Sequence, residues 1–168
     1  MIPAFPRSLE RTLISAITRR RASTEGQERW ALLNASQAET LARLLTTHTA
    51  EQWSRATGQA IDAPMLAGVR AQVEVELRRI LDAEADEVPR HPKLIARDLV
   101  TQGRMMLTRE AARLAGVRRF RWRTQRDSRV REAHKAIDGN VYDFTTGAPG
   151  EGLPGEPWGC RCSAEPVL

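Results

Sequence analysis

The residues best suited to chemistry lie near the C-terminal end of the sequence. Cys160 and Cys162 are separated by one residue, and His134 lies upstream on a segment predicted to be a short helix. In an extended segment, side chains two residues apart point to the same side, so both sulfurs would face one way. Two thiols and one imidazole are ligands that zinc prefers. The pattern therefore allows a zinc site formed by His134, Cys160 and Cys162.

Other interpretations of these residues remain open. A structural zinc site needs a fourth ligand, which Asp127, Asp138, Asp143 or water would have to supply. Without a metal, both thiols would behave as small buried hydrophobic groups, and His134 would hydrogen-bond to the neighbouring loop. A reactive or oxidisable pair is a further alternative, although a disulfide between residues two apart would close a small, strained ring.

A metal- or thiol-dependent hydrolase is an alternative function for the same residues. Cys160 or Cys162 would be the nucleophile, His134 the base, and Asp127 or Asp138 the group that orients it. Nothing in the sequence supplies an oxyanion hole, and the nucleophile would lie at a strand end. We therefore predict that the protein is not an enzyme and keep the hydrolase as an alternative.

The segment before these cysteines predicts how they are held. Asp127 is expected to cap a short helix that runs through Ile137 and ends at Gly139, with Arg131 and His134 on the same side. Trp122 and Trp158 are expected to anchor the small core. We call the predicted arrangement the structural clasp, and its residues are Trp122, Asp127, Arg131, His134, Asp138, Gly139, Trp158, Cys160 and Cys162.

A dense group of arginines precedes the predicted short helix. Residues 119–124 alternate strictly, which predicts a strand with Phe120 and Trp122 on one face and arginines on the other. These arginines could contact DNA phosphates or an acidic protein surface, or they could pair with nearby acids and fix the loop. The candidate contact residues are Arg118, Arg119, Arg121 and Arg123.

The remaining elements follow from periodicity and from glycine and proline. Apolar residues at helical spacing predict four helices, at residues 8–21, 36–58 (or starting near Thr24), 62–89 and 92–116. Gly103 would weaken the last helix or allow a close helix crossing. Residues 140–144 are expected to form a second strand, residues 145–159 a Gly/Pro-rich loop, and the start of CRCSAEPVL a third strand.

The composition sets the broad class. Of 168 residues, 41% are hydrophobic and 28% charged, which is typical of a globular protein that is neither disordered nor membrane-bound. The net charge of +5 favours contact with phosphates or an acidic partner. No signal peptide or membrane span is expected. Two cysteines that are one residue apart provide no disulfide framework, so a reducing compartment is the simpler interpretation. The predicted fold is α+β, with a helical region at 1–116 and a small mixed unit of short strands and one short helix at 117–168.

The C-terminal unit resembles the Mu F-like family of phage head morphogenesis (minor capsid) proteins. The similarity covers about a third of the chain. Its matching positions are Trp122, Thr124, Asp127, Arg129, Val130, Arg131, His134, Asp138, Gly139, Pro157, Cys160, Arg161 and Cys162.

The resemblance implies a structural role in a virus head. Such a protein would act in procapsid assembly, contact the portal, major capsid or scaffolding protein, and in some cases travel with the DNA. It would be found in the virion, and in the host cytoplasm during assembly. The chain is short for the family and has no added domain of the toxin or ADP-ribosyltransferase type, so no activity is expected from such a fusion. A basic nucleic-acid-binding module is the first alternative function.

Overall fold

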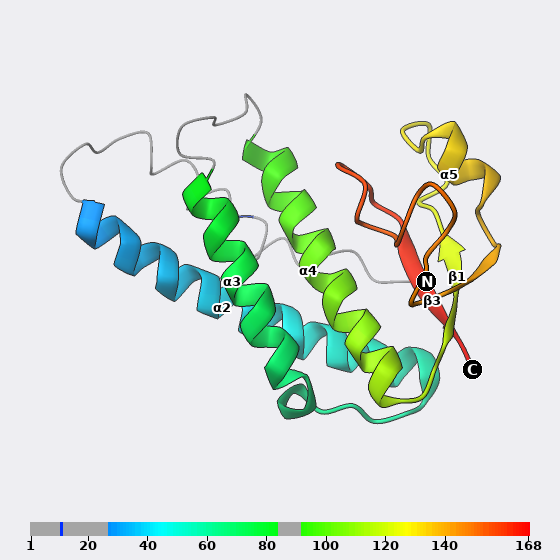
Figure 1. Cartoon of the computed structure of the whole chain (residues 1–168), viewed down its shortest axis with the longest axis horizontal. Coiled ribbons are helices and arrows are strands. Elements are labelled where there is room, and N and C mark those ends of the chain that lie inside the picture. The colour runs from blue at the N-terminus through cyan, green and yellow to red at the C-terminus, as the bar shows by residue number, and fades with distance from the viewer. Residues whose placement is uncertain (1–10, 12–26, 84–91) are drawn as a thin grey trace.

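The computed structural model describes residue 11 and residues 27–83 and 92–168. The predicted helix at residues 8–21 lies outside the described residues, except for Arg11. The elements that bear on the site are α2 (Gln27–Thr57), a 3-10 helix η2 (Ala63–Leu66), α3 (Ala67–Ala83), α4 (Pro92–Leu114), β1 (Arg119–Arg123), α5 (Glu132–Ala136), β2 (Val141–Asp143) and β3 (Ser163–Val167). Helices followed by a small sheet confirm the predicted α+β class (Figure 1).

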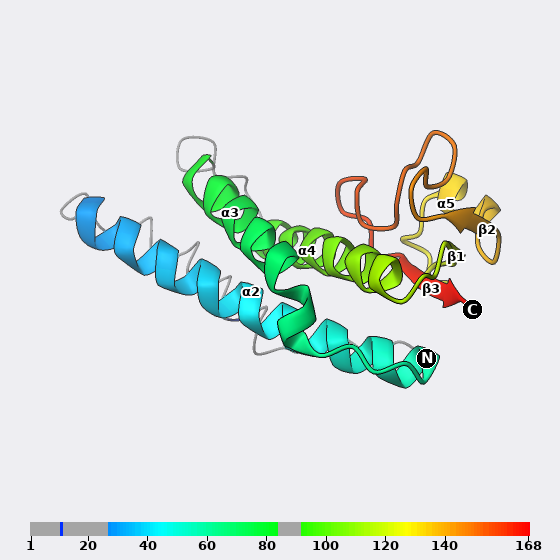
Figure 2. The same cartoon turned by 60° about the horizontal axis from the view of Figure 1, so that its bottom comes forward.

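The helical region is built from α2, α3 and α4. Figure 2 shows α2 crossing beneath α3 and α4, with the sheet lying beyond the C-terminal end of α4. The helices approach closely at Gly103 of α4, because a Cβ atom built there would lie 3.2 Å from both Leu45 Cδ1 and Val73 Cγ1. Gly103 therefore permits the close crossing that was one of its two predicted roles.

The sheet has the order β2-β1-β3, and both pairings are antiparallel. The strand predicted at 119–124 is confirmed as β1, with Phe120 and Trp122 fully buried and the arginines that alternate with them more exposed. The predicted position of the third strand was wrong, because β3 begins at Ser163, after both cysteines. The cysteines therefore belong to the irregular segment that enters β3.

The two predicted units share one hydrophobic core. The buried cluster runs from Ala38 and Leu41 on α2, through Leu107 on α4, to Trp122 and Cys162 in the C-terminal unit. A unit as small as 117–168 can bury little apolar surface by itself, and packing on the helices extends its core. Among the described residues, no helix combines the length and apolar character that a membrane span requires.

Helix boundaries follow the turn residues. α2 ends at Thr57, just before Gly58, whose φ of 71° is the left-handed conformation that glycine adopts readily. Its start at Gln27 lies nearer to the predicted alternative start than to Ser36. Pro64 lies in the first turn of η2, which continues directly into α3. α4 begins at Pro92, as predicted.

Candidate metal centre

The structure brings His134, Cys160 and Cys162 together in a buried group, the His–Cys–Cys cluster. His134 Nδ1 lies 3.8 Å from Cys160 Sγ and 3.5 Å from Cys162 Sγ. All three ligand atoms lie within 4.8 Å of one another. The exposed fractions of the three residues are 2%, 4% and 3%. The cluster can therefore hold a metal ion through one nitrogen and two sulfurs.

The histidine ring is oriented by two neighbours. Its Nε2 lies 2.9 Å from Glu151 Oε2, on the opposite side of the ring from the sulfurs. The Trp122 ring packs edge-on against it, with centroids 5.3 Å apart. A metal-binding histidine commonly donates its second N–H to a carboxylate, which fixes the tautomer that leaves the other nitrogen free to bind. Glu151 therefore completes an arrangement typical of a metal site, and sequence reasoning missed it.

Each of the two thiols shifts the pKa of the other. A hydrogen bond from the Cys162 side chain lowers the pKa of Cys160 to about 6. The same interaction, together with burial, raises the pKa of Cys162. The Trp122 indole nitrogen is buried and has no hydrogen-bond partner of ordinary geometry in the described part of the chain, yet it acts on Cys162 to lower the pKa of that thiol. A buried N–H facing a sulfur suits a metal-bound thiolate.

No fourth protein ligand joins this group within the described residues. The three aspartates considered from the sequence are engaged elsewhere. Asp138 accepts hydrogen bonds from the Thr124 amide (2.9 Å) and the Arg126 guanidinium (3.1 Å). Asp143 accepts bonds from the Thr145 amide and hydroxyl. A water molecule or a group from a partner would therefore have to complete a tetrahedral site.

The predicted cap of the short helix was wrong. α5 begins at Glu132 with Arg131 as its N-cap residue, so Asp127 lies in the preceding turn. Its carboxylate accepts two hydrogen bonds from the Arg161 guanidinium, at 2.7 and 2.6 Å, and one from the Arg129 amide. An aspartate that bonds the amide two residues ahead stabilises a turn, which competes with helix formation. Asp127 therefore connects this turn to the residue between the two cysteines.

The Asp127–Arg161 pair predicts a pH-dependent stability. The paired guanidinium lowers the pKa of Asp127 to about 2. Because the folded-state pKa is depressed, the stabilisation is fully present above the ordinary value near 3.8 and is lost as the pH falls through about 2. We expect Asp127→Asn to lower the melting temperature at pH 5, and the gap from wild type to narrow as the pH falls towards 2.

Asp62→Asn is the matched control for this experiment, because Asp62 is exposed and makes no side-chain capping bond. It should leave the melting temperature almost unchanged throughout the titration. A gap between Asp127→Asn and wild type that stays constant with pH would contradict the assignment.

Arg131 contacts Trp158 at its backbone carbonyl group and not at its side chain. The Arg131 guanidinium donates to the Trp158 carbonyl oxygen, which ties α5 to the loop before the cysteines. The prediction that Trp158 anchors the core was wrong, because its side chain is 54% exposed. Gly155 and Gly159, on either side of it, adopt positive φ of 96° and 68°, so the loop turns tightly and leaves the indole outside.

Asp98 of α4 holds this loop from the helical side. It is 2% exposed, accepts a 2.7 Å hydrogen bond from the Gly159 amide and accepts a 2.8 Å bond from Gln102. Burial raises the pKa of Asp98, although both bonds oppose that shift. The sequence carried a signal for this residue. Asp98 lies three residues after Ile95 and four after Leu94, which places an acid on the apolar side of the predicted helix.

The strand arginines have different environments. Arg123 lies 2.6 Å from Glu165, and Arg121 donates to the Gly139 carbonyl at 3.1 Å. Both side chains therefore help to hold β1 to its neighbours. Arg118 and Arg119 are exposed, and their charges help to lower the pKa of Asp143. Gly139, with a φ of 87°, also donates its amide to the Trp122 carbonyl.

Comparison with known proteins extends the resemblance beyond the clasp. The family model described as "Phage Mu protein F like protein" matches residues 7–165. The chain belongs to this family. The match includes the helical region, whereas the motifs that suggested the family lie only in the C-terminal unit.

One relative is an uncharacterized protein of Haemophilus influenzae (strain ATCC 51907 / DSM 11121 / KW20 / Rd). It is 28% identical over 114 residues, which is 66% of this chain and 26% of that protein. The chain thus spans about a quarter of the length of that relative. No solved structure matches the chain significantly.

Proposed function

We propose that this Mu F-like chain is a structural component of a phage head, which docks on the portal or the inner capsid shell during procapsid assembly. The observation that carries the proposal is the family match over residues 7–165, which spans the helices and the clasp together. The protein then resides in the host cytoplasm during assembly and in the virion afterwards. The portal, major capsid and scaffolding proteins are its candidate partners.

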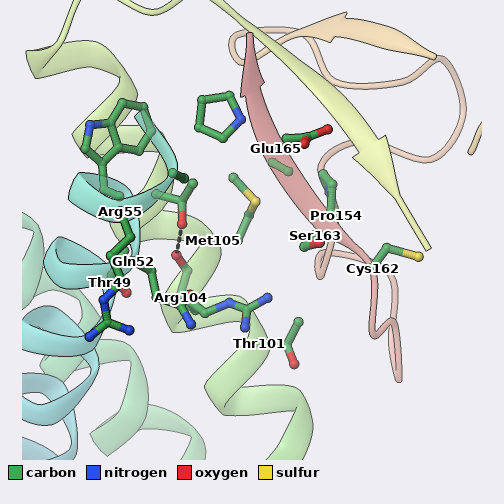
Figure 3. Close-up of a pocket in the computed structure, with 15 residues that line it drawn as sticks. Thr49, Gln52, Arg55, Thr101, Arg104, Met105, Pro154, Cys162, Ser163 and Glu165 are labelled. Atoms are coloured by element: carbon green, nitrogen blue, oxygen red, sulfur yellow. Dashed lines mark hydrogen bonds between the residues drawn. The ribbon is translucent and has the colours of Figure 1, made fainter. Parts of the chain in front are cut away.

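A non-enzymatic role is supported by the state of the candidate nucleophiles. His134, Cys160 and Cys162 are all at least nine-tenths buried, and they face one another. A hydrolase needs its nucleophile and base to reach a substrate, with donors placed for the developing oxyanion. The Cys162 sulfur also points away from the nearest cavity (Figure 3). The groups that could do chemistry are therefore directed towards the protein interior.

Zinc is the metal that best suits the cluster. One imidazole and two thiols form a soft donor set, and the Glu151 carboxylate orients the imidazole. Bound zinc would supply a cross-link between α5 and the segment that enters β3. Such a cross-link stabilises a unit whose own core is small. The structural clasp then acts as a rigid element, and the helices to which it is attached dock on the capsid shell.

Two exposed features provide surfaces for partners. Trp158 is exposed on the loop held by Asp98 and Arg131, and tryptophan is among the residues enriched at binding hot spots. Arg118 and Arg119 are exposed at the start of β1 and can meet an acidic protein surface or DNA phosphates. Trp158 belongs to the portal or shell contact, and these arginines belong to contact with DNA if the chain accompanies the genome.

Genetic removal tests the assembly role directly. Deleting the gene from a phage that carries it is expected to abolish or sharply reduce infectious particles, and expression in trans should restore them. A tagged chain should sediment with procapsids and cross-link to portal or shell protein. Finding the tag on ejected DNA would support transport with the genome. Normal heads and normal infectivity without the chain, or substrate turnover by the purified protein, would contradict the proposal.

A further inference from the structure

A cavity between the helices and the sheet contains a positive charge that no carboxylate of the described chain neutralises. The cavity has a volume of about 430 Å³ and is lined by α2, α4, Pro154 and the segment 162–166. Arg104 extends into it from α4 (Figure 3). The guanidinium lies deep enough that loss of hydration lowers the pKa of Arg104, although the residue as a whole keeps some exposed surface.

The acid in the cavity wall already forms an ion pair with another arginine. Glu165 lines the same cavity, but its carboxylate lies 2.6 Å from Arg123 Nε on the neighbouring strand. Burial lowers the pKa of His48 on α2, and the positive charge of Arg104 lowers it further. An arginine remains protonated in a protein, so burial without a partner costs stability. A protein that retains such a residue has a use for the charge.

Two buried polar groups beside Arg104 also lack partners. Thr49 and Trp53 of α2 are each 3% exposed and line the cavity. Neither Thr49 Oγ1 nor Trp53 Nε1 has a hydrogen-bond partner in the described structure.

The free Thr49 hydroxyl is unusual for these helices. Hydroxyl groups on α2 and α4 commonly donate to the carbonyl four residues earlier, as in Thr46, Thr47, Ser54, Thr57, Thr101 and Thr108. Thr49 does not, although it occupies the same kind of helical position. Its hydroxyl therefore remains available to a ligand in the cavity.

We infer that this cavity binds a carboxylate side chain from an extended segment of a partner protein, with Arg104 as the cation and Thr49 as a hydrogen-bond donor. A carboxylate is a planar acceptor that matches a guanidinium. Apolar wall residues such as Met105 and Pro166 would contact the rest of the segment. A DNA duplex presents its phosphates on a wide convex surface, so they would not reach a charge at this depth.

The sheet edge at this cavity limits how the segment binds. β3 is an edge strand, and an extended peptide can add to such an edge through backbone hydrogen bonds. Pro166 lies within β3 and lacks an N–H, which opposes continuous strand addition. The segment is therefore held mainly through its acidic side chain. This inference deepens the proposed docking role and rests on it for the identity of the partner, whereas binding can be measured on the isolated chain.

Binding of a minimal probe tests the inference. N-acetylglutamate N-methylamide, titrated into the full chain, should shift the Trp53 indole N–H signal in NMR spectra with a saturable dependence. Trp53→Phe assigns that signal. The glutamine analogue should bind at least about tenfold more weakly, because it removes the charge that Arg104 recognises. Equal binding of both probes, or stronger binding of inorganic phosphate, would overturn the inference.

Two variants separate recognition from folding. Arg104→Met should abolish the shift and raise the melting temperature by a few degrees, because it removes an unpaired buried charge. Arg55→Met is the matched control, since Arg55 lines the same cavity but is exposed and paired with Glu51 at 3.1 Å. Arg55→Met should retain the glutamate affinity within about twofold. A lower melting temperature for Arg104→Met would mean that Arg104 is structural, and would refute the inference. Head assembly enters neither measurement, so a failed docking role would be seen separately.

Discussion

Protein purified without a chelator is expected to contain about one equivalent of zinc, and removal of that zinc should lower its melting temperature by about 10 °C. The reason is geometric, because His134, Cys160 and Cys162 already converge with their ligand atoms within 4.8 Å of one another. Protein without zinc would leave two thiols and an imidazole buried without the cation that they surround. Elemental analysis gives the stoichiometry, and thermal unfolding with and without chelator gives the loss.

Variants of the His–Cys–Cys cluster should distinguish the residues that bind zinc from the residue that orients His134. Cys162→Ser should abolish zinc binding, because it removes one of three protein ligands. Glu151→Gln should weaken zinc binding by about 10–100-fold while leaving the three ligands in place, because it alters the group that orients His134. His48→Gln is the control, since His48 contacts Gln52 on α2 and lies outside the cluster. It should keep full zinc content.

A spectroscopic measurement excludes adventitious metal. Cobalt in place of zinc should give sulfur-to-cobalt charge-transfer absorption in the near ultraviolet, and Cys160→Ser should reduce it. Less than about a tenth of an equivalent of metal in protein expressed with ample zinc would end the zinc proposal. The clasp would then be held by hydrogen bonds and packing alone, as in the metal-free interpretation of the sequence.

Regular elements were predictable because their side chains repeat with a fixed period. The alternation of Phe120 and Trp122 with arginines identified β1, since a strand places alternate side chains on opposite faces. Pro92 likewise marked the start of α4, because proline is accepted in the first turn of a helix. These signals are local, so a sequence shows them without knowledge of the tertiary structure.

The convergence of His134 with the cysteines could be predicted for a different reason. Their chemistry suggested a shared role, although no rule of spacing places residue 134 beside residue 160. The residues that hold the cluster and its loop in place could not be predicted in this way. Glu151 reaches His134 from a loop, and Asp98 reaches Gly159 from a helix far earlier in the chain. Such partners are set by long-range packing, which periodicity does not report.

The errors at Asp127 and Trp158 have a common physical origin. Both lie in segments where the backbone leaves regular structure, and side-chain preference alone cannot show which alternative prevails. Asp127 favours a turn as strongly as a helix cap, and the Arg161 pair selects the turn. Trp158 is apolar enough for a core, yet the positive φ of Gly155 and Gly159 directs its loop outward.

Trp122 is buried and Trp158 is exposed, so substituting each in turn tests whether Trp158 contributes to the core. Trp122 is fully buried and packs against Phe120, at a centroid distance of 6.4 Å, and against His134. Trp122→Ala is expected to reduce the free energy of unfolding by about 3–5 kcal/mol, because it removes a large buried side chain and leaves a cavity. It should also weaken zinc binding, since it removes one of the groups that position the His134 ring. Denaturant unfolding measures the first effect, and a competition titration with a zinc chelator measures the second.

Trp158→Ala is the matched variant, because it removes the same side chain from the surface. Its carbonyl bond to Arg131 uses the backbone and survives the substitution. The free energy of unfolding should therefore change by less than about 0.5 kcal/mol. If the exposed indole contacts the shell, the same variant should reduce incorporation of the chain into heads while the purified protein stays folded. Equal destabilisation by the two substitutions would show that Trp158 anchors the core after all, and the loop carrying it would then have no free side chain to offer a partner.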